Sequence, residues 1–271
     1  MDRRLILLLF LSVWTHSPQV YALATLSDQA DTATFHIVRY HQAWMEDDRL
    51  YIQTELCSGT LADERFVPLP RRYKLIRELC LALQFLHHHD MVHLDIKPEN
   101  IFLKNDQFKL GDFGLVTQNT AGVDVEEGDS RYMSRELLAG DHSDLTKSDI
   151  FSLGATVYEI CLGRPLPMNG PEWQDMRSDR LDPLPGTSPE LVRLIQWMMK
   201  AQASDRPTAQ QLLEHPQLLS NEQKALQAEK SKVRQANMEL VRFQKLSSSP
   251  PPRKGLTRAN TWNGSTTLKY L

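Results

Sequence analysis

The chain has 271 residues, 41% of them apolar and 24% charged, and a formal net charge of −3. These values are ordinary for a folded globular protein, and the slightly acidic balance argues against general nucleic-acid binding. Three widely spaced cysteines, Cys57, Cys80 and Cys161, form neither a disulfide framework nor a CxxC metal motif, so a reducing compartment is expected.

The first two dozen residues have the pattern of a secretory signal peptide. Basic residues Arg3-Arg4 precede an aliphatic run over residues 5–11, and Ala22-Leu23-Ala24 has the small-x-small form of a cleavage site. The apolar run is too short to cross a bilayer comfortably. Secretion is one interpretation of residues 1–24, and the other is that residues 1–19 are not the original start of the domain.

A β-hairpin is predicted next, followed by a helix. Residues 36–44 alternate roughly between apolar and polar side chains, residues 46–48 read as a turn, and residues 50–56 form a second strand. Residues 71–89 carry apolar side chains at three- and four-residue steps, which predicts a helix with one buried face. Its three terminal histidines, residues 87–89, point about 100° apart and cannot easily share one metal ion, so we interpret them as a polar helix end.

Two motifs carry the chemistry of the chain. They are His93-Leu94-Asp95-Ile96-Lys97-Pro98-Glu99-Asn100 and Gly111-Asp112-Phe113-Gly114. Phosphoryl transfer from a nucleotide needs an acceptor for the substrate hydroxyl proton, a cation near the γ-phosphate and ligands for Mg²⁺. Asp95 fits the first role, Lys97 the second, and Asn100 and Asp112 the third. Because both motifs agree in type, order and spacing, the sequence resembles the catalytic centre of a protein kinase that uses ATP and Mg²⁺.

His93 is expected to hold this catalytic loop in place rather than to take part in the chemistry. A resemblance to one kinase family follows from further motifs, and it covers roughly residues 20–220. They are Glu126-Glu127-Gly128-Asp129-Ser130-Arg131-Tyr132, Leu166-Pro167-x-Asn169-Gly170-x-x-Trp173, His93-x-Asp95-Ile96-Lys97-Pro98 and Val38-Arg39-Tyr40. These runs resemble the Wee kinases, while residues 111–115 are nearer the form of the related Myt branch.

The resemblance implies an α+β, protein-kinase-like fold, mainly the helical C-terminal lobe with a remnant β-hairpin of the N-terminal lobe. Residues 20–60 would be the small-lobe remnant and residues 61–220 the helical lobe. The implied activity is ATP-dependent phosphorylation of a tyrosine on a mitotic cyclin-dependent kinase, which delays G2/M entry, in the nucleus and cytoplasm. Lys97 is typical of serine/threonine kinases, so tyrosine specificity rests on the resemblance alone. Neither nucleic acid nor a membrane is expected as a partner.

By the same resemblance, Thr54 is the gatekeeper, and Glu55, Leu56 and Cys57 line the hinge whose backbone groups bind adenine. Leu94 stands where many kinases have an arginine that pairs with a phosphate in the activation segment. The segment already carries four acids: Asp124, Glu126, Glu127 and Asp129. We therefore expect the order of this segment not to depend on phosphorylation.

The remaining motifs are expected to be scaffold. The resemblance pairs Glu136 with Arg206 as a buried ion pair, and it makes Asp149 a support that binds the backbone of the catalytic loop. Ser188, followed by proline, and Thr208 are predicted N-caps of two helices.

The C-terminal residues divide into a helix and a tail. Residues 221–246 are charged and lack glycine and proline, which predicts a solvated extension helix. Apolar residues recur every seven positions within it, but over too few repeats to assert a coiled coil. Residues 247–271 are rich in Ser, Pro, Thr and Gly, which predicts disorder. Within them Arg258 lies three residues before Thr261, comparable to a C-terminal 14-3-3 site of Wee kinases; an unmodified tail is the alternative.

Three parts of a kinase are not found before Asp95: a glycine-rich phosphate loop, a lysine for the α- and β-phosphates, and a helix C glutamate. The first glycine of the chain is Gly59 and the first lysine is Lys74. Val20-Tyr21-Ala22 resembles the middle of the Wee helix C, with Gln19 where the glutamate is expected.

Residues 1–19 are therefore expected to replace an original small lobe, and the chain as written is expected to be a weak or inactive kinase. The two alternatives are a catalytically inactive lobe that only binds substrate or 14-3-3, and a secreted kinase-like protein. The two-stranded remnant is expected to expose an unpaired strand edge, which would favour aggregation.

Overall fold

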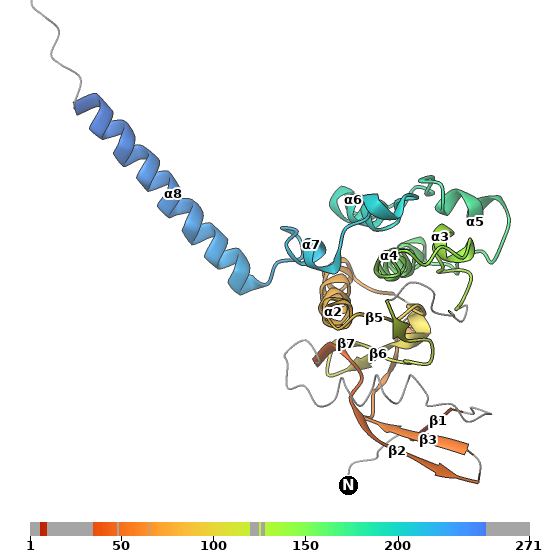
Figure 1. Cartoon of the computed structure of the whole chain (residues 1–271). Helices are drawn as coiled ribbons and strands as arrows, with labels where there is room; N and C mark the ends of the chain where they lie inside the picture. The colour runs from red at the N-terminus through yellow and green to blue at the C-terminus, as the bar shows by residue number, and fades with distance from the viewer. Residues whose placement is uncertain are drawn as a thin grey trace, which may run out of the picture. The chain divides into compact units, whose positions relative to one another are not determined.

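The computed structural model describes residues 6–9, 35–47, 49–64, 66–119, 125 and 128–247. The chain divides into two compact units, Met1–Ser220 and Asn221–Leu271, which are considered separately (Figure 1). The proposed helix C residues 19–22 and the acids at 124, 126 and 127 lie outside the described residues.

The first unit is an α+β structure with short strands and longer helices. Its strands are β1 (Ile6–Leu9), β2 (Tyr40–Glu46), β3 (Arg49–Thr54), β4 (Gly59–Thr60), β5 (Met91–Val92), β6 (Ile101–Lys104), β7 (Gln107–Leu110) and β8 (Thr117–Gln118). Its helices are α2 (Leu69–His88), α3 (Arg135–Leu138), α4 (Thr146–Leu162), α5 (Pro171–Met176), α6 (Pro189–Met198) and α7 (Ala209–Leu213), with 3-10 turns η2 (Leu61–Asp63), η3 (Pro98–Asn100) and η4 (Ala203–Asp205).

The predicted hairpin is present as β2 and β3, but it is not two-stranded. β1 runs antiparallel along β3, giving a sheet of order β1-β3-β2. The prediction of a two-stranded remnant is therefore wrong, because β1 covers the β3 edge of the hairpin, whereas β2 stands at the other end of this sheet. The physical reason is that an apolar run such as Ile6–Leu9 serves equally well as a strand, and pairing satisfies the backbone groups of β3. β1 lies within the residues interpreted as a signal-like leader.

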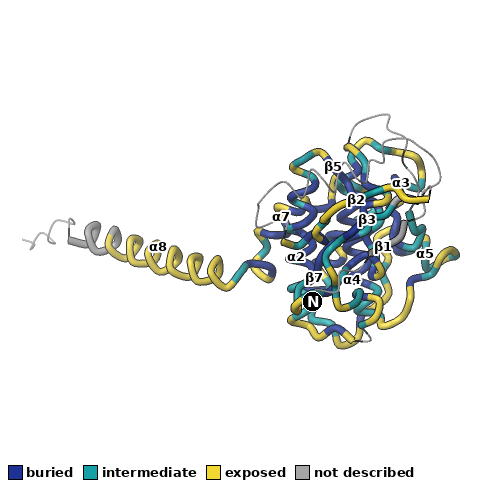
Figure 2. Tube along the Cα trace, turned by 90° about the horizontal axis from the view of Figure 1, so that it is seen from below, coloured by how far each residue is buried: buried dark blue, intermediate teal, exposed yellow. Residues whose placement is uncertain are grey.

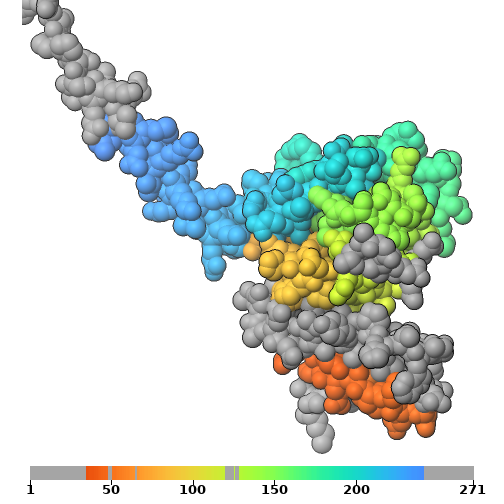
Figure 3. Space-filling model, in the orientation of Figure 1, coloured from red at the N-terminus to blue at the C-terminus, as the bar shows by residue number. Residues whose placement is uncertain are grey.

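Helices α2 and α4 form the centre of the helical lobe. Residues 148–158 of α4 are all buried, as expected for a helix that is surrounded by other elements. α2 packs against α4, α7, β5 and β7 with its predicted apolar face, including Leu75, Leu79 and Leu83, which are fully buried. The tube is accordingly dark blue through this region (Figure 2). On the face that Figure 3 shows, the orange to yellow residues of α2 adjoin the cyan residues of α7.

The predicted helix caps are confirmed. The Ser188 hydroxyl accepts a hydrogen bond from Leu191 N at 3.3 Å at the start of α6. Thr208 and Gln211 form a capping box at the start of α7, where Gln211 N donates to Thr208 Oγ1 at 3.1 Å and Thr208 N to Gln211 Oε1 at 2.8 Å.

The second unit contains α8, which spans Asn221–Ser247. Its side chains are exposed over residues 221–240, and the heptad-spaced Leu226, Val233 and Leu240 are each more than half exposed. Thr261 and the tail beyond residue 247 lie outside the described residues. Among the described helices of the chain, none is both long and apolar enough to cross a membrane.

The predicted ion pair between Glu136 and Arg206 is confirmed; the Arg206 side chain is fully buried and that of Glu136 is 15% exposed. Arg206 Nη2 donates to Glu136 Oε2 at 2.8 Å, and a second bond joins Nη1 and Oε1. The guanidinium also donates to the carbonyl oxygens of Lys200 (2.7 Å) and Lys147 (2.9 Å), and it lies over the Phe151 ring. Burial alone would raise the pKa of Glu136, but the hydrogen bonds and the charge of Arg206, with smaller contributions from other hydrogen bonds, together lower it, so the pair is ionised.

Removing one member of this pair leaves the other charge buried without a counter-ion. Arg206→Met is expected to lower the free energy of unfolding by about 3–5 kcal/mol, measured by urea denaturation. The double variant Glu136→Leu/Arg206→Met should recover part of the loss, because no unpaired charge remains. Arg180→Met, which removes an exposed ion pair with Asp175, is the control and should change stability little. A loss for Arg206→Met no larger than this control would contradict the argument.

Candidate active site

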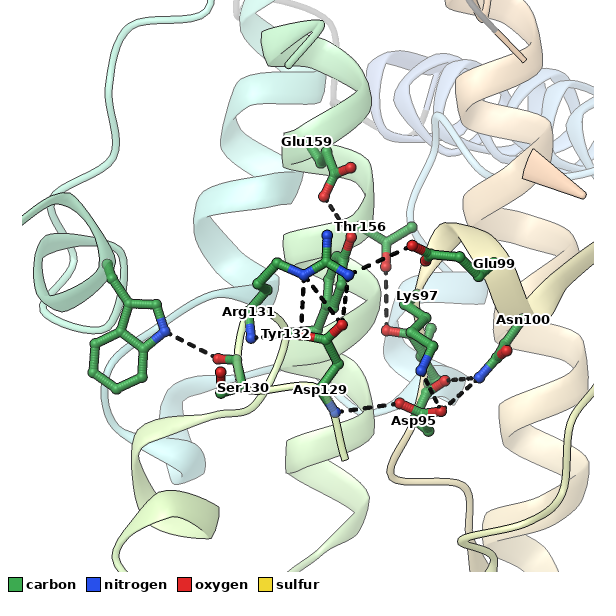
Figure 4. A network of polar contacts seen from close by, with 12 residues as sticks. Asp95, Lys97, Glu99, Asn100, Asp129, Ser130, Arg131, Tyr132, Thr156 and Glu159 are labelled. Carbon is green, nitrogen blue, oxygen red and sulfur yellow. Dashed lines mark hydrogen bonds and ion pairs between the residues drawn. The ribbon is translucent and has the colours of Figure 1, made fainter. Parts of the chain in front are cut away.

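Asp95 lies on the loop between β5 and η3, and three groups bind its carboxylate. Oδ2 accepts hydrogen bonds from Lys97 Nζ and from Asn100 Nδ2, both at 2.7 Å, while Oδ1 accepts a longer bond of 3.4 Å from Asp129 N (Figure 4). The side chain is 11% exposed. The structure therefore brings together three of the four residues predicted from the motifs, and it leaves Oδ1 as the more weakly bound oxygen.

The orientation of Asn100 follows from its partners. Its side-chain nitrogen donates to both Asp95 O (2.9 Å) and Asp95 Oδ2, which only the NH₂ end of an amide can do. Asn100 N also donates to Lys97 O at 3.0 Å, which closes the 3-10 turn η3. The amide oxygen is consequently the end of Asn100 that is turned away from Asp95.

Gly111 joins the second motif to the first. Its N–H donates to Asn100 O at 2.9 Å, and its carbonyl accepts from His93 Nε2 at 3.0 Å. A Cβ at this position would lie 2.7 Å from the Phe102 ring and 2.8 Å from Val38, so the close approach requires glycine. Asp112 follows immediately, so the backbone next to one predicted metal ligand is hydrogen-bonded to the backbone of the other, Asn100.

Asn100 and Asp112 fit the chemistry of a magnesium site. Asp112 uses Oδ1 to accept a 3.3 Å bond from Gly114 N, which leaves its second carboxylate oxygen and the Asn100 amide oxygen as hard oxygen ligands. Mg²⁺ in nucleotide sites uses one or two such protein ligands, with phosphates and water completing the octahedron. Asp112 has a φ of 56°, a left-handed conformation that glycine would adopt more readily and that aspartate tolerates.

His93 is buried and structural, as predicted. Its Nδ1 accepts from Asp95 N at 3.3 Å while Nε2 donates to Gly111 O, and these roles assign the neutral tautomer with the proton on Nε2. The ring meets Phe113 edge-on at 5.2 Å. Burial lowers the pKa of His93, although the nearby carboxylates of Asp149 and Asp95 oppose that effect.

Asp149, in the first turn of α4, binds the backbone of the catalytic loop. One carboxylate oxygen accepts Leu94 N at 2.8 Å, and the other accepts His93 N at 3.0 Å and lies 2.9 Å from His87 Nε2. Asp149 is fully buried. These bonds hold Leu94 at a φ of 64°, a strained conformation for a leucine. The role of His87 was missed, because histidines at the end of a helix give no indication of a partner 62 residues away.

The hinge residue Glu55 directs its carboxylate into the protein. It binds Lys104 Nζ at 2.8 Å, Lys109 Nζ at 2.9 Å and Arg39 N at 2.9 Å. Burial alone would raise the pKa of Glu55, but these hydrogen bonds together lower it below its ordinary value. Lys109 lies on β7, three residues before Asp112, so this ion pair links the hinge to the strand that carries the predicted metal ligand. Neither lysine was singled out from the sequence.

The other hinge residues leave the end of β3 together. Thr54 is half-buried at the last position of the strand, Leu56 is 39% exposed and Cys57 is half-buried. Ser58 ends the turn, because its N–H and its hydroxyl both donate to Leu103 O, at 2.7 and 2.8 Å. The side chain of Glu55 is thus used as a support, and the backbone N–H of Glu55 donates to Arg39 O at 2.8 Å. Adenine binding by the backbone of residues 55–57 stays a prediction.

The activation segment is joined to the catalytic loop by protein side chains. Arg131 binds Asp129 at 2.5 Å and reaches Glu99 at 3.5 Å (Figure 4). Leu94, 3% exposed, packs in one apolar cluster with Met133 of the segment. These contacts are made by protein side chains alone, and the independence of the segment from phosphorylation stays a prediction.

A sequence model of the protein kinase domain matches residues 25–218. The chain belongs to the protein kinase family. It is 40% identical over 200 residues to a Wee1-like protein kinase of Oryza sativa, a match covering 73% of this chain and 38% of the relative. It is 33% identical over 291 residues to Wee1-like protein kinase 1-A of Xenopus laevis, covering 92% of this chain and 50% of the relative.

A third relative is the membrane-associated tyrosine- and threonine-specific cdc2-inhibitory kinase wee-1.3 of Caenorhabditis elegans, 41% identical over 191 residues, with 67% of this chain and 28% of the relative covered. The chain thus spans half or less of the length of these relatives. The matches confirm the resemblance to the Wee kinases and the kinase-like α+β fold. Within the family, the part of the chain that matches includes every predicted site residue from Thr54 to Asp112.

Because His93 is buried as the neutral form, acid should destabilise this kinase lobe. The unfolded state binds the proton near the ordinary pKa of about 6.5, whereas the folded state binds it only at lower pH, so stability falls as pH drops below that value. His93→Gln should be less stable than the parent at pH 7.5 but lose less on acidification to pH 5.5. Urea denaturation at both values measures the difference. His41→Gln, at an exposed position of β2, is the control; equal acid losses for all three proteins would count against the argument.

Proposed function

We propose that this chain carries the catalytic and metal-binding half of a Wee-type kinase, which transfers the γ-phosphoryl group of ATP to a tyrosine of a cyclin-dependent kinase. The observation that supports it best is the constellation of Asp95, Lys97 and Asn100, to which the residue before Asp112, Gly111, is bonded through its backbone N–H. The tyrosine and the cyclin-dependent kinase are suggested by the printed name of the C. elegans relative, a tyrosine- and threonine-specific cdc2-inhibitory kinase.

In the proposed mechanism, Asp95 Oδ1 accepts the proton of the substrate hydroxyl, since Oδ2 is already bonded to Lys97 and Asn100. Lys97, 2.7 Å from Asp95, carries the positive charge that stabilises the transferring phosphoryl group. Asn100 and Asp112 would hold Mg²⁺, which neutralises charge on the phosphates when bound. The hinge backbone from Glu55 to Cys57, with Thr54 as gatekeeper, would bind the adenine.

The cellular role that follows from this proposal is inhibition. A phosphate on the tyrosine of a mitotic cyclin-dependent kinase would delay entry into mitosis, and such a kinase would act in the nucleus and cytoplasm. A binding-only role is the second candidate, and one observation favours it. The polypeptide has no glycine before Gly59 and no lysine before Lys74, so it contains no phosphate loop or phosphate-binding lysine preceding the hinge.

Phosphorylation of a purified cyclin-dependent kinase–cyclin complex separates the two candidates. The 271-residue polypeptide alone is expected to show little or no transfer, because positioning of the nucleotide supplies most of the catalysis. Residues 36–271 joined to the small lobe of the Xenopus relative should phosphorylate tyrosine. Asp95→Asn in that chimera should lower kcat by about 10²–10⁴-fold.

The control is Asp141→Asn, an exposed aspartate whose loss should leave kcat unchanged. Treatment of the chimera with a phosphatase before the assay should also leave its activity intact, because Leu94 packs in a buried apolar cluster with Met133 of the activation segment and needs no phosphate. Transfer only to serine or threonine, or full activity of Asp95→Asn, would overturn the proposed function. An inactive chimera that still binds the complex would favour the binding-only role.

A second partner is proposed for the C-terminal tail. Arg258, three residues before Thr261, gives the tail a basic residue at the spacing found in 14-3-3 ligands. A peptide of residues 255–267 phosphorylated at Thr261 should bind 14-3-3 in a fluorescence polarisation assay. The unphosphorylated peptide should not bind, and Arg258→Ala should weaken binding. Absence of binding by the phosphopeptide would remove this partner.

A further inference from the structure

Arg177 is a buried cation that the proposed mechanism leaves without a role. It directly follows α5 and is 3% exposed. Burial lowers the pKa of its guanidinium to about 10. The guanidinium carbon Cζ lies over the ring of Trp173, four residues earlier, at 3.9 Å from the ring centroid. Burying a guanidinium costs free energy, so its contacts indicate what it stabilises.

The contacts of Arg177 are backbone carbonyl oxygens, most of them in the activation segment. Nε donates to Met133 O at 2.9 Å, and Nη2 donates to Ser130 O at 2.7 Å and to Arg131 O at 3.1 Å. Nη1 donates to Trp173 O at 2.9 Å, which anchors the guanidinium to its own helix. One side chain thus fixes three of the four carbonyl groups of residues 130–133.

The same backbone is held by two more donors. Trp173 Nε1 donates to Ser130 O at 3.0 Å, and Ser152 of α4 donates to the remaining carbonyl, Tyr132 O, at 2.9 Å. All four carbonyls of residues 130–133 are therefore bonded to side chains of α4, α5 or Arg177. This leaves the segment few ways to move without breaking several bonds at once.

The held segment leads directly to Asp95. Asp129 N donates to Asp95 Oδ1, the oxygen proposed to accept the substrate proton, and Tyr132 N donates to Asp129 O at 3.0 Å. The backbone of Gly128, the residue before Asp129, also packs closely against the catalytic loop, because a Cβ on Gly128 would lie 2.8 Å from Leu94 O. A continuous series of contacts thus runs from Arg177 through residues 130–133 to the carboxylate of Asp95.

We propose that Arg177 is a positioning residue, which fixes the backbone of residues 129–133 against Oδ1 of Asp95, the oxygen proposed to accept the substrate proton. The proposal rests on the function proposed above for its consequence in catalysis, but not for the geometry. An arginine is needed because its planar fork reaches several carbonyls at once, whereas a lysine ammonium is a single point of charge.

Segment-resolved hydrogen exchange of the full 271-residue chain tests this geometry. In Arg177→Met, the amides of residues 129–133 should exchange roughly tenfold faster or more, as expected when a local opening loses at least one hydrogen bond. The amides of His93 and Leu94, which Asp149 binds, should be unchanged. Arg177→Lys should behave like Arg177→Met, because it restores the charge but not the fork.

Two further variants keep the test decisive. Trp173→Phe keeps the ring and removes one N–H, so it should accelerate the same amides to a smaller extent even if Arg177→Met does not fold. Arg180→Met, an exposed arginine three residues further along, should match the parent. Uniform acceleration over residues 35–220 would show a general structural role and overturn the proposal, as would unchanged exchange at residues 129–133 or full rescue by lysine.

Binding of the same proteins to a purified cyclin-dependent kinase–cyclin complex separates this inference from the proposed function. Arg177→Met should bind more weakly than the parent and Arg180→Met equally well. If the parent chain does not bind the complex at all, the proposed substrate loses support. The exchange measurements then still decide whether Arg177 positions the segment, because they require no substrate.

Discussion

The catalytic loop depends on the buried carboxylate of Asp149. It accepts the backbone amides of His93 and Leu94 and contacts His87, and it lies on α4, the most deeply buried helix of the lobe. A buried carboxylate without such donors would be strongly destabilising. The stability of α4 therefore depends on the amides of the catalytic loop, and the conformation of the loop depends on Asp149. The left-handed φ of Leu94 persists because these bonds over-determine it, and the turn that follows brings Asp95 towards Lys97 and Asn100.

Much of the candidate site could be predicted from the sequence because its contacts are local. Lys97 and Asn100 reach Asp95 across two and five residues, so their spacing alone brings them together once the 3-10 turn forms. The residues that support the site make contacts with partners far away in the sequence, and no spacing in the sequence indicates these contacts. Glu55 is bound by lysines 49 and 54 positions later, and Arg177 binds a segment more than 40 residues before it. Only the fold brings these residues into contact.

The fold shows the same division. The helices follow from apolar periodicity and caps, as at Ser188 and Thr208, and the hairpin β2–β3 follows from alternation and a turn. β1 could not be predicted as a strand, because the run Ile6–Leu9 has the composition of a signal peptide as much as that of a strand. What makes it a strand is the free edge of β3, and the availability of a partner is not written in the local sequence.

The order of the activation segment has to come from buried contacts rather than from its visible ion pairs. Arg131 and its partners Asp129 and Glu99 are partly exposed, and ion pairs of this kind contribute little because water screens them. Arg177 and Leu94, by contrast, are each 3% exposed and act from inside the lobe. Leucine packing on Met133 and carbonyl binding by a buried guanidinium are both insensitive to phosphorylation. If Arg177 positions the segment as proposed, a leucine at position 94 would remove the arginine that could bind a phosphate and still leave the segment supported from inside the lobe.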